Sequence, residues 1–104
     1  MKNNINQFYS IENCKLASML LSANIPFQFR DLYDGTQILF PSIENCIADA
    51  VCHSNSCGHE KGLLEIMGVG VQDVADDVEG YLTAEEVFRR WSAYYDQKEG
   101  AVIV

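Results

Sequence analysis

The sequence predicts a single two-layer α+β domain over residues 1–104, with elements in the order α-β-β-β-α-α and a three-stranded antiparallel sheet. Three observations predict this class. Apolar residues recur with a helical period before residue 24 and after residue 83, but with a period of two in the strands between them. An Asp34-Gly35 pair favours a tight hairpin turn. The length of 104 residues and the hydrophobic share of 48% suit one folded core.

The first predicted element is a helix that Ser10 caps and that extends to about Ala23. Asn24 suits the left-handed residue after its end, and the Ile25-Pro26 step stops it. We expect the helix to be largely buried, with Cys14 as a small core residue, because apolar residues cover more than half of its circumference. These residues are Ile11, Cys14, Leu16, Ala17, Met19, Leu20 and Leu21.

Three strands are expected next. The first begins at Phe27, the second returns from the turn at residues 36–40, and the third covers residues 45–53. Residues 60–67 then predict a short helix with Leu63, Leu64 and Met67 facing inward and Gly68 at its end. Residues 69–80 are expected to form a loop.

The last helix has the clearest signals. Thr83 and Glu86 form a capping box, and Leu82 and Val87 can form a hydrophobic staple. Its apolar face is expected in the core and consists of Val87, Phe88, Trp91, Tyr94 and Tyr95. Gly100 is expected to end the helix. The β-prone tail at residues 101–104 is left with three alternatives: an added strand in this chain, a homodimer contact with a second copy, or a frayed end.

Charge restricts the classes of partner. The chain has 15 acids and 7 bases, a formal charge of −8, and residues 60–99 contribute ten acids and four bases. Direct binding to a nucleic-acid backbone is disfavoured because that affinity comes from Lys and Arg. Binding to a basic protein surface is favoured; the alternative is an acidic surface that serves only solubility. The N-terminus lacks a secretory signal and the chain lacks a long apolar run, so we expect a cytoplasmic protein without membrane contact.

One short segment carries the clearest metal-binding chemistry. Cys52, His53, Cys57 and His59 could supply four zinc ligands from a single loop that joins a strand to the next helix. The alternative is that Cys52 packs in the core, Cys57 is an incidental thiol, and the histidines cap the helix or hydrogen-bond the loop. A catalytic alternative pairs a thiolate with an imidazole that Asp49 orients, but nothing in the sequence fixes an oxyanion hole. We therefore expect a protein that is not an enzyme.

Two segments carry a family resemblance. Residues 52–68 and 77–88 resemble a family of small uncharacterised proteins carried by phages and mobile elements of Firmicutes. His53, Gly58 and His59 have counterparts in that family, whereas the position of Cys57 is often aromatic. This departure argues against a metal site shared across the family.

The resemblance implies a phage origin, and the size, charge and element order are then similar in outline to anti-CRISPR inhibitors. By that analogy, acidic side chains would replace phosphates in the basic channel of a CRISPR effector nuclease and block its nucleic-acid binding. The expected contact residues are Asp73, Asp76, Asp77, Glu79, Glu85 and Glu86. The alternatives are a zinc-stapled structural or regulatory phage module that binds protein, and a weak cysteine enzyme.

Overall fold

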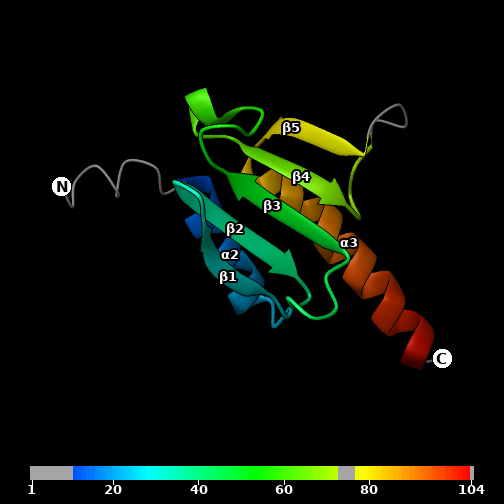
Figure 1. Cartoon of the computed structure of the whole chain (residues 1–104). Helices are drawn as coiled ribbons and strands as arrows, with labels where there is room; N and C mark the ends of the chain where they lie inside the picture. Colours follow the sequence, from blue (N-terminus) through cyan, green and yellow to red (C-terminus); the bar gives the residue numbers. More distant parts are fainter. Residues whose placement is uncertain (1–10, 73–76, 104) are drawn as a thin grey trace.

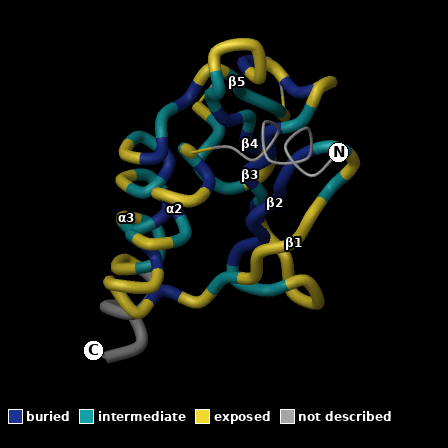
Figure 2. The backbone as a smooth tube through the Cα atoms, turned by 90° about the vertical axis from the view of Figure 1, so that its left-hand side faces the viewer, coloured by how far each residue is buried: buried dark blue, intermediate teal, exposed yellow. Residues whose placement is uncertain are grey.

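The computed structural model describes residues 11–72 and 77–103 and shows an α+β fold. A five-stranded antiparallel sheet has the strand order β1-β2-β3-β4-β5, and two helices cover one of its faces (Figures 1 and 2). The elements are α2 (Ile11–Ser22), β1 (Gln28–Leu32), β2 (Gly35–Phe40), β3 (Ala48–Cys52), η1 (His59–Lys61), β4 (Leu64–Gly68), β5 (Val78–Leu82) and α3 (Ala84–Ile103). The α+β class is confirmed, whereas the three-stranded sheet and the order α-β-β-β-α-α are wrong.

The predicted hairpin is present as β1 and β2. Leu32 pairs with Gly35, so the two-residue loop consists of Tyr33 and Asp34 and lies one residue earlier than the Asp-Gly pair suggested. Gly35 has a different role. A Cβ atom on Gly35 would lie within 2 Å of the Cys52 carbonyl oxygen, at 1.8 Å, so a larger residue would separate β2 from β3.

The helix predicted over residues 60–67 is wrong. The chain makes one short 3₁₀ turn, η1, and then forms β4, which pairs with β3 from Val51–Glu65 to Ala48–Gly68. Leu64 and Ile66 are fully buried while Met67 is exposed, which is the alternation of a strand. β3 is buried at four of its five positions, and pairing with both β2 and β4 satisfies its backbone groups.

The segment predicted as a loop over residues 69–80 ends in the strand β5. This strand pairs with β4, with an irregular register between Leu64 and Ile66. Gly80 lies in β5 where a Cβ atom would be 2.7 Å from the carbonyl oxygen of Cys57. The strand therefore needs a glycine at a position that reads as a loop signal in the sequence.

The core lies between the sheet and the helices. Trp91 of α3 is fully buried, stacks on Phe40 with ring centroids 5.1 Å apart, and donates its indole N–H to the Val69 carbonyl oxygen at 3.0 Å. Leu16 and Leu20 of α2 are fully buried beside it. The expected core face of α3 is confirmed for Val87 and Trp91; Phe88, Tyr94 and Tyr95 pack against the core while partly buried.

α2 is less buried than expected. Its fully buried residues are Asn13, Leu16 and Leu20, whereas Ile11 is 75% exposed, Leu21 is 70% exposed and Cys14 is also exposed. The prediction of Cys14 as a core residue is therefore wrong, because α2 packs by one narrow side against the sheet and α3. Asn24 has the expected left-handed backbone, with φ of 60°. The expected cap at Ser10 lies outside the described residues.

α3 begins with the predicted capping box. The Thr83 amide donates to Glu86 Oε1 at 2.9 Å, and the Glu86 amide donates to Thr83 Oγ1 at 3.2 Å. The predicted end at Gly100 is wrong, since the helix continues to Ile103 and the tail is helical up to that residue. One glycine costs a helix only about 1 kcal/mol relative to alanine and need not end it. Neither described helix is long and apolar enough to cross a membrane.

Candidate functional site

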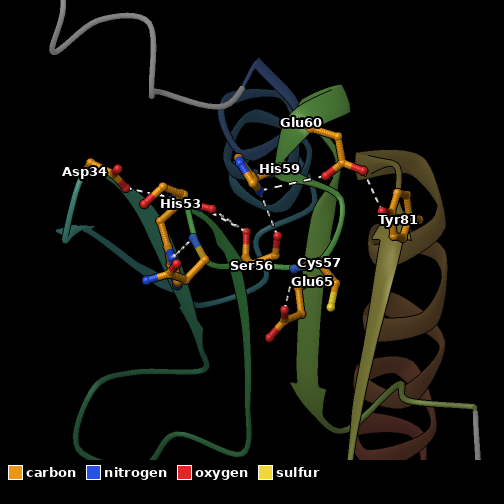
Figure 3. Close-up of polar contacts among 10 residues, drawn as sticks. Asp34, His53, Ser56, Cys57, His59, Glu60, Glu65 and Tyr81 are labelled. Carbon is orange, nitrogen blue, oxygen red and sulfur yellow. Dashed lines mark hydrogen bonds and ion pairs between the residues drawn. The ribbon is translucent and has the colours of Figure 1, made fainter.

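The chemistry-bearing segment forms the loop between β3 and β4, residues 53–63, hereafter the β3–β4 loop (Figure 3). Ser56 organises its first turn. Its amide and hydroxyl both donate to the His53 carbonyl oxygen at 2.9 Å, and its hydroxyl accepts from the His53 amide at 3.0 Å. Ser56 is buried, so these bonds form away from water and fix the path of the loop.

The loop is docked on β5 through two glycines. Gly58, with φ of 102°, lies where a Cβ atom would be 2.9 Å from the Tyr81 amide nitrogen. Gly80 lies against Cys57, whose carbonyl oxygen accepts the Tyr81 amide at 3.3 Å. Tyr81 itself has φ of 62°, an uncommon backbone conformation for a bulky residue. Close backbone contact between loop and strand holds this conformation in place.

The two predicted cysteine ligands lie in different environments. Cys52 ends β3 and belongs to the buried core cluster between sheet and helices. Cys57 is exposed, and its amide donates to Glu65 Oε1 at 2.6 Å. Figure 3 shows its thiol pointing away from both imidazole rings. The structure therefore places Cys52 in the buried core and Cys57 at the surface.

The two imidazoles differ in their availability for a metal. His53 Nδ1 accepts a hydrogen bond from the Asn55 amide at 3.1 Å, so the proton of the neutral ring is on Nε2. The ring also makes an edge contact with Tyr33, with centroids 5.2 Å apart. His59 Nδ1 lies 3.1 Å from the Ser56 carbonyl oxygen. A carbonyl only accepts, so Nδ1 carries the proton and Nε2 keeps its lone pair, which is the usual arrangement of a metal-binding histidine.

The four predicted metal ligands are thus close in sequence but do not converge. Among residues 11–72 and 77–103 there is no group of three or more His, Cys, Asp or Glu side chains that could hold a metal ion. His59 has a suitable tautomer, while His53 would have to give up its bond to the Asn55 amide. Cys52 would have to leave the core.

A hydrogen-bonded pair that the sequence did not suggest lies where the loop meets β5. The Tyr81 hydroxyl donates to Glu60 Oε2 at 2.5 Å, and His59 Nδ1 lies 3.8 Å from the other carboxylate oxygen of Glu60. The Tyr81 hydroxyl holds the pKa of Glu60 below its usual value, and the carboxylate raises the pKa of Tyr81. No periodic signal joins residues 60 and 81, because their contact depends on the docking of the loop on β5.

The expected contact acids separate into two groups. Asp73 and Asp76 lie outside the described residues, and Asp77 is exposed. Glu79, Glu85 and Glu86 instead bond within the chain. Glu79 pairs with Arg90 at 2.9 Å, Glu85 pairs with Lys15 at 3.0 Å, and Glu86 caps α3.

The sheet face opposite the helices carries a polar row that the sequence analysis also missed. Arg30 Nε donates to Gln37 Oε1 at 2.7 Å, and Gln37 Nε2 donates to Asp49 Oδ2 at 2.7 Å. Burial raises the pKa of Asp49, and the nearby Glu65 carboxylate raises it further, while the bond from Gln37 lowers it. The polar positions of the alternating strands were the available signal. The described hydrogen bond of Asp49 comes from Gln37 and not from a histidine, whereas the catalytic alternative would need Asp49 to orient an imidazole.

Comparison with models of known protein families, with characterised proteins and with solved structures finds no match for this chain.

Proposed function

We propose that the protein is a non-enzymatic, phage-encoded inhibitor of a host defence system. It would bind the basic channel of a CRISPR effector nuclease and block nucleic-acid binding there. The observation that carries the proposal is the charge of −8. A strongly acidic surface attracts a basic one and speeds its association. The phage origin is supported by the sequence resemblance alone. The class of partner is supported by the analogy of size and charge, since the element order used in that analogy is wrong.

Contacts within the fold lower the pKa of several carboxylates. The Lys15 ammonium, by hydrogen bonding and by its charge, holds the pKa of Glu85 below its usual value. Tyr81 does the same for Glu60, and a bond from the Ser54 amide does so for Asp34. Carboxylates with ordinary pKa values are already ionised at pH 7, so these contacts extend the ionised range of the three groups to lower pH. The negative charge on which the proposal rests is therefore present at neutral pH.

Ion pairs and hydrogen bonds within the chain determine how available each expected contact acid is to a partner. A partner's lysine or arginine would have to displace Lys15 to reach Glu85, and would disrupt α3 or the Arg90 pair to reach Glu86 or Glu79. Asp77 is exposed just before β5, and a partner could reach it without displacing any of the contacts described above. We therefore propose Asp77 as the leading described contact, with Glu85 as a weaker one.

The test uses a purified CRISPR effector nuclease with its guide RNA. Binding of labelled target DNA is measured while this protein is titrated, at about 0.05 M and about 0.5 M salt. We expect inhibition at low salt and its loss at high salt, because exposed charges more than about 10 Å apart are already screened at 0.1 M. Unchanged DNA binding at a tenfold excess would contradict the proposal, and salt-insensitive inhibition would contradict the acidic mode of contact.

Two single substitutions provide a matched comparison. Asp77→Asn and Glu44→Gln each remove one charge from an exposed carboxylate, one beside β5 and one in the β2–β3 connection. We expect Asp77→Asn to weaken inhibition about fivefold, as for loss of an ion pair of about 1 kcal/mol. We expect Glu44→Gln to change it less than about twofold. Equal effects would indicate attraction by net charge without a defined contact.

A further inference from the structure

The sheet has two edges of different character. β1 forms one edge and β5 the other. Four of the five residues of β1 are exposed, and its pairing with β2 is regular over its whole length. Within the described part of the chain no strand pairs with the outer side of β1. A regular exposed edge of this kind presents backbone N–H and C=O groups to another strand.

β5 is a poorer edge for pairing. Its register with β4 is irregular. The strand also contains Gly80, and Tyr81 has φ of 62°. The Tyr81 amide is already bonded to the Cys57 carbonyl oxygen of the β3–β4 loop. Irregular register and local covering are the devices that prevent edge-to-edge association. β1 has neither of these devices in the described structure.

The hairpin determines which backbone groups of β1 point outward. A two-residue turn places the Leu32 carbonyl opposite the Gly35 amide, so these residues form a hydrogen-bonded pair. Such pairs alternate along an antiparallel ladder. Arg30 and Gln28 therefore bond to β2, while the N–H and C=O groups of Phe29 point away from it.

We propose that β1 pairs in antiparallel fashion with β1 of a second copy of this chain, joining two five-stranded sheets into one. The two-fold axis is normal to the sheet, so side chains on the same face meet. Within β1 this symmetry allows only registers centred on one residue. Like charges placed directly opposite each other destabilise such a pair.

The sequence of β1 favours one register. Centring on Arg30 or Asp31 would place two like charges opposite each other. Centring on Gln28 or on Leu32, the two ends of β1, would leave only one pair of residues within the strand. Centring on Phe29 pairs the two phenyl rings and places Gln28 opposite Arg30 of the second copy.

A second copy fits this edge for two reasons beyond register. Phe29 is 39% exposed in the described structure, and an aromatic cross-strand pair would remove that surface from water. β1 also carries one positive and one negative residue, Arg30 and Asp31, so the paired strands are electrically balanced although the chain as a whole is acidic. The net charge of β1 therefore adds no repulsion between the paired strands. The proposal does not depend on the identity of any other partner.

The test is sedimentation equilibrium of the full chain and its variants between about 5 µM and about 1 mM, a range that covers weak association. We expect the average mass of the wild type to rise from 11.7 kDa towards twice that value. The average mass of Phe29→Lys and of Phe29→Glu should each stay near the monomer value of 11.7 kDa. Their dimer association constants should be at least tenfold lower than that of the wild type. An equimolar mixture of the two should regain the higher mass, because residue 29 of each copy faces residue 29 of the other. Circular dichroism confirms that each variant is folded.

Tyr33→Lys is the matched control. Tyr33 is 83% exposed and lies in the β1–β2 turn. The Tyr33→Lys variant should therefore associate as strongly as the wild type. Hydrogen exchange adds a backbone measurement: the amide of Phe29 should become more protected as concentration rises, while those of Gln28 and Arg30 should not change. A wild type that stays monomeric throughout would overturn the proposal. Failure of the Lys and Glu variants to associate with each other would overturn its register.

Discussion

Replacement of Glu79 by glutamine should destabilise the fold. Glu79 lies on β5, and its carboxylate receives two bonds from the Arg90 guanidinium of α3, at 2.9 Å and 3.2 Å, and one from the Gln72 amide at 2.9 Å. The Arg90 side chain is 10% exposed and that of Glu79 is 24% exposed. The pair therefore joins the edge of the sheet to the last helix in a site that is largely shielded from water.

The expected cost is about 1–2 kcal/mol at pH 7. A hydrogen bond to a charged group contributes about 1.5–3 kcal/mol, and loss of one partner of a fully buried pair costs about 3–5 kcal/mol. Glu79 is partly exposed and glutamine retains an acceptor oxygen, so we expect a loss of stability at or below the lower end of the first range and below the second. For a domain of this size, about 1 kcal/mol corresponds to about 4–8 °C in melting temperature.

The cost should depend on pH in a defined direction. The bonds from Arg90, and then the Gln72 amide, hold the pKa of Glu79 below its usual value of 4.5. The folded state therefore favours the ionised carboxyl, and the stabilisation is complete above pH 4.5. It is lost as the pH falls through the lowered pKa of the folded state. The melting temperatures of wild type and Glu79→Gln should converge in strong acid, where both side chains are neutral.

The measurement is thermal unfolding of four proteins: the wild type, Glu79→Gln, Arg90→Met and the double variant. The double-mutant cycle isolates the pair from other effects of each substitution. Asp77→Asn, two residues away and exposed, is the control and should unfold within about 0.5 kcal/mol of the wild type. A coupling free energy near zero, or an equal loss in the control, would refute the structural role of Glu79.

Two further predictions concern the β3–β4 loop. Gly80→Ala should loosen the docking of the loop on β5 and speed amide exchange at Tyr81, because its Cβ atom would lie 2.4 Å from that of Cys57. The control Gly62→Ala, with no atom within 4 Å of its Cβ, should cost only backbone strain at φ of 71° and leave that exchange unchanged. Excess chelator should leave the melting temperature unchanged; a fall of many degrees would instead support the zinc hypothesis for Cys52, His53, Cys57 and His59.

The elements that the sequence predicted correctly are those whose signals are local. The capping box of α3 needs only residues three apart, and the β1–β2 hairpin needs only a short turn. β4 was misassigned because Leu63, Leu64 and Met67 fit a helical spacing, while Leu64 and Ile66 fit a strand. Short apolar segments carry both patterns, and here pairing with β3 decides between them.

The site was less predictable because its contacts join distant segments. Four potential ligands within eight residues suggested a metal centre, yet the residue that organises the loop is Ser56, through bonds to the His53 backbone. The Gln37–Asp49 bond depends on the pairing of β2 with β3, and the Glu60–Tyr81 bond depends on the docking of the β3–β4 loop on β5. Cys14 illustrates the same limit. When apolar residues cover most of a helix, the sequence does not show which side packs against the core.

The division of the acidic residues has a consequence for function. Residues 60–99 carry most of the negative charge, but Glu79 and Glu86 use theirs to hold β5 and α3 in place. If every acid were equally free, neutralising any of them would weaken partner binding without altering the fold. In this structure, substitution of Glu79 or Glu86 would lower binding through instability, whereas substitution of Asp77 would lower it through lost charge. Binding measured alongside melting temperature for the same variants separates these two causes, and only the second identifies a contact with the partner.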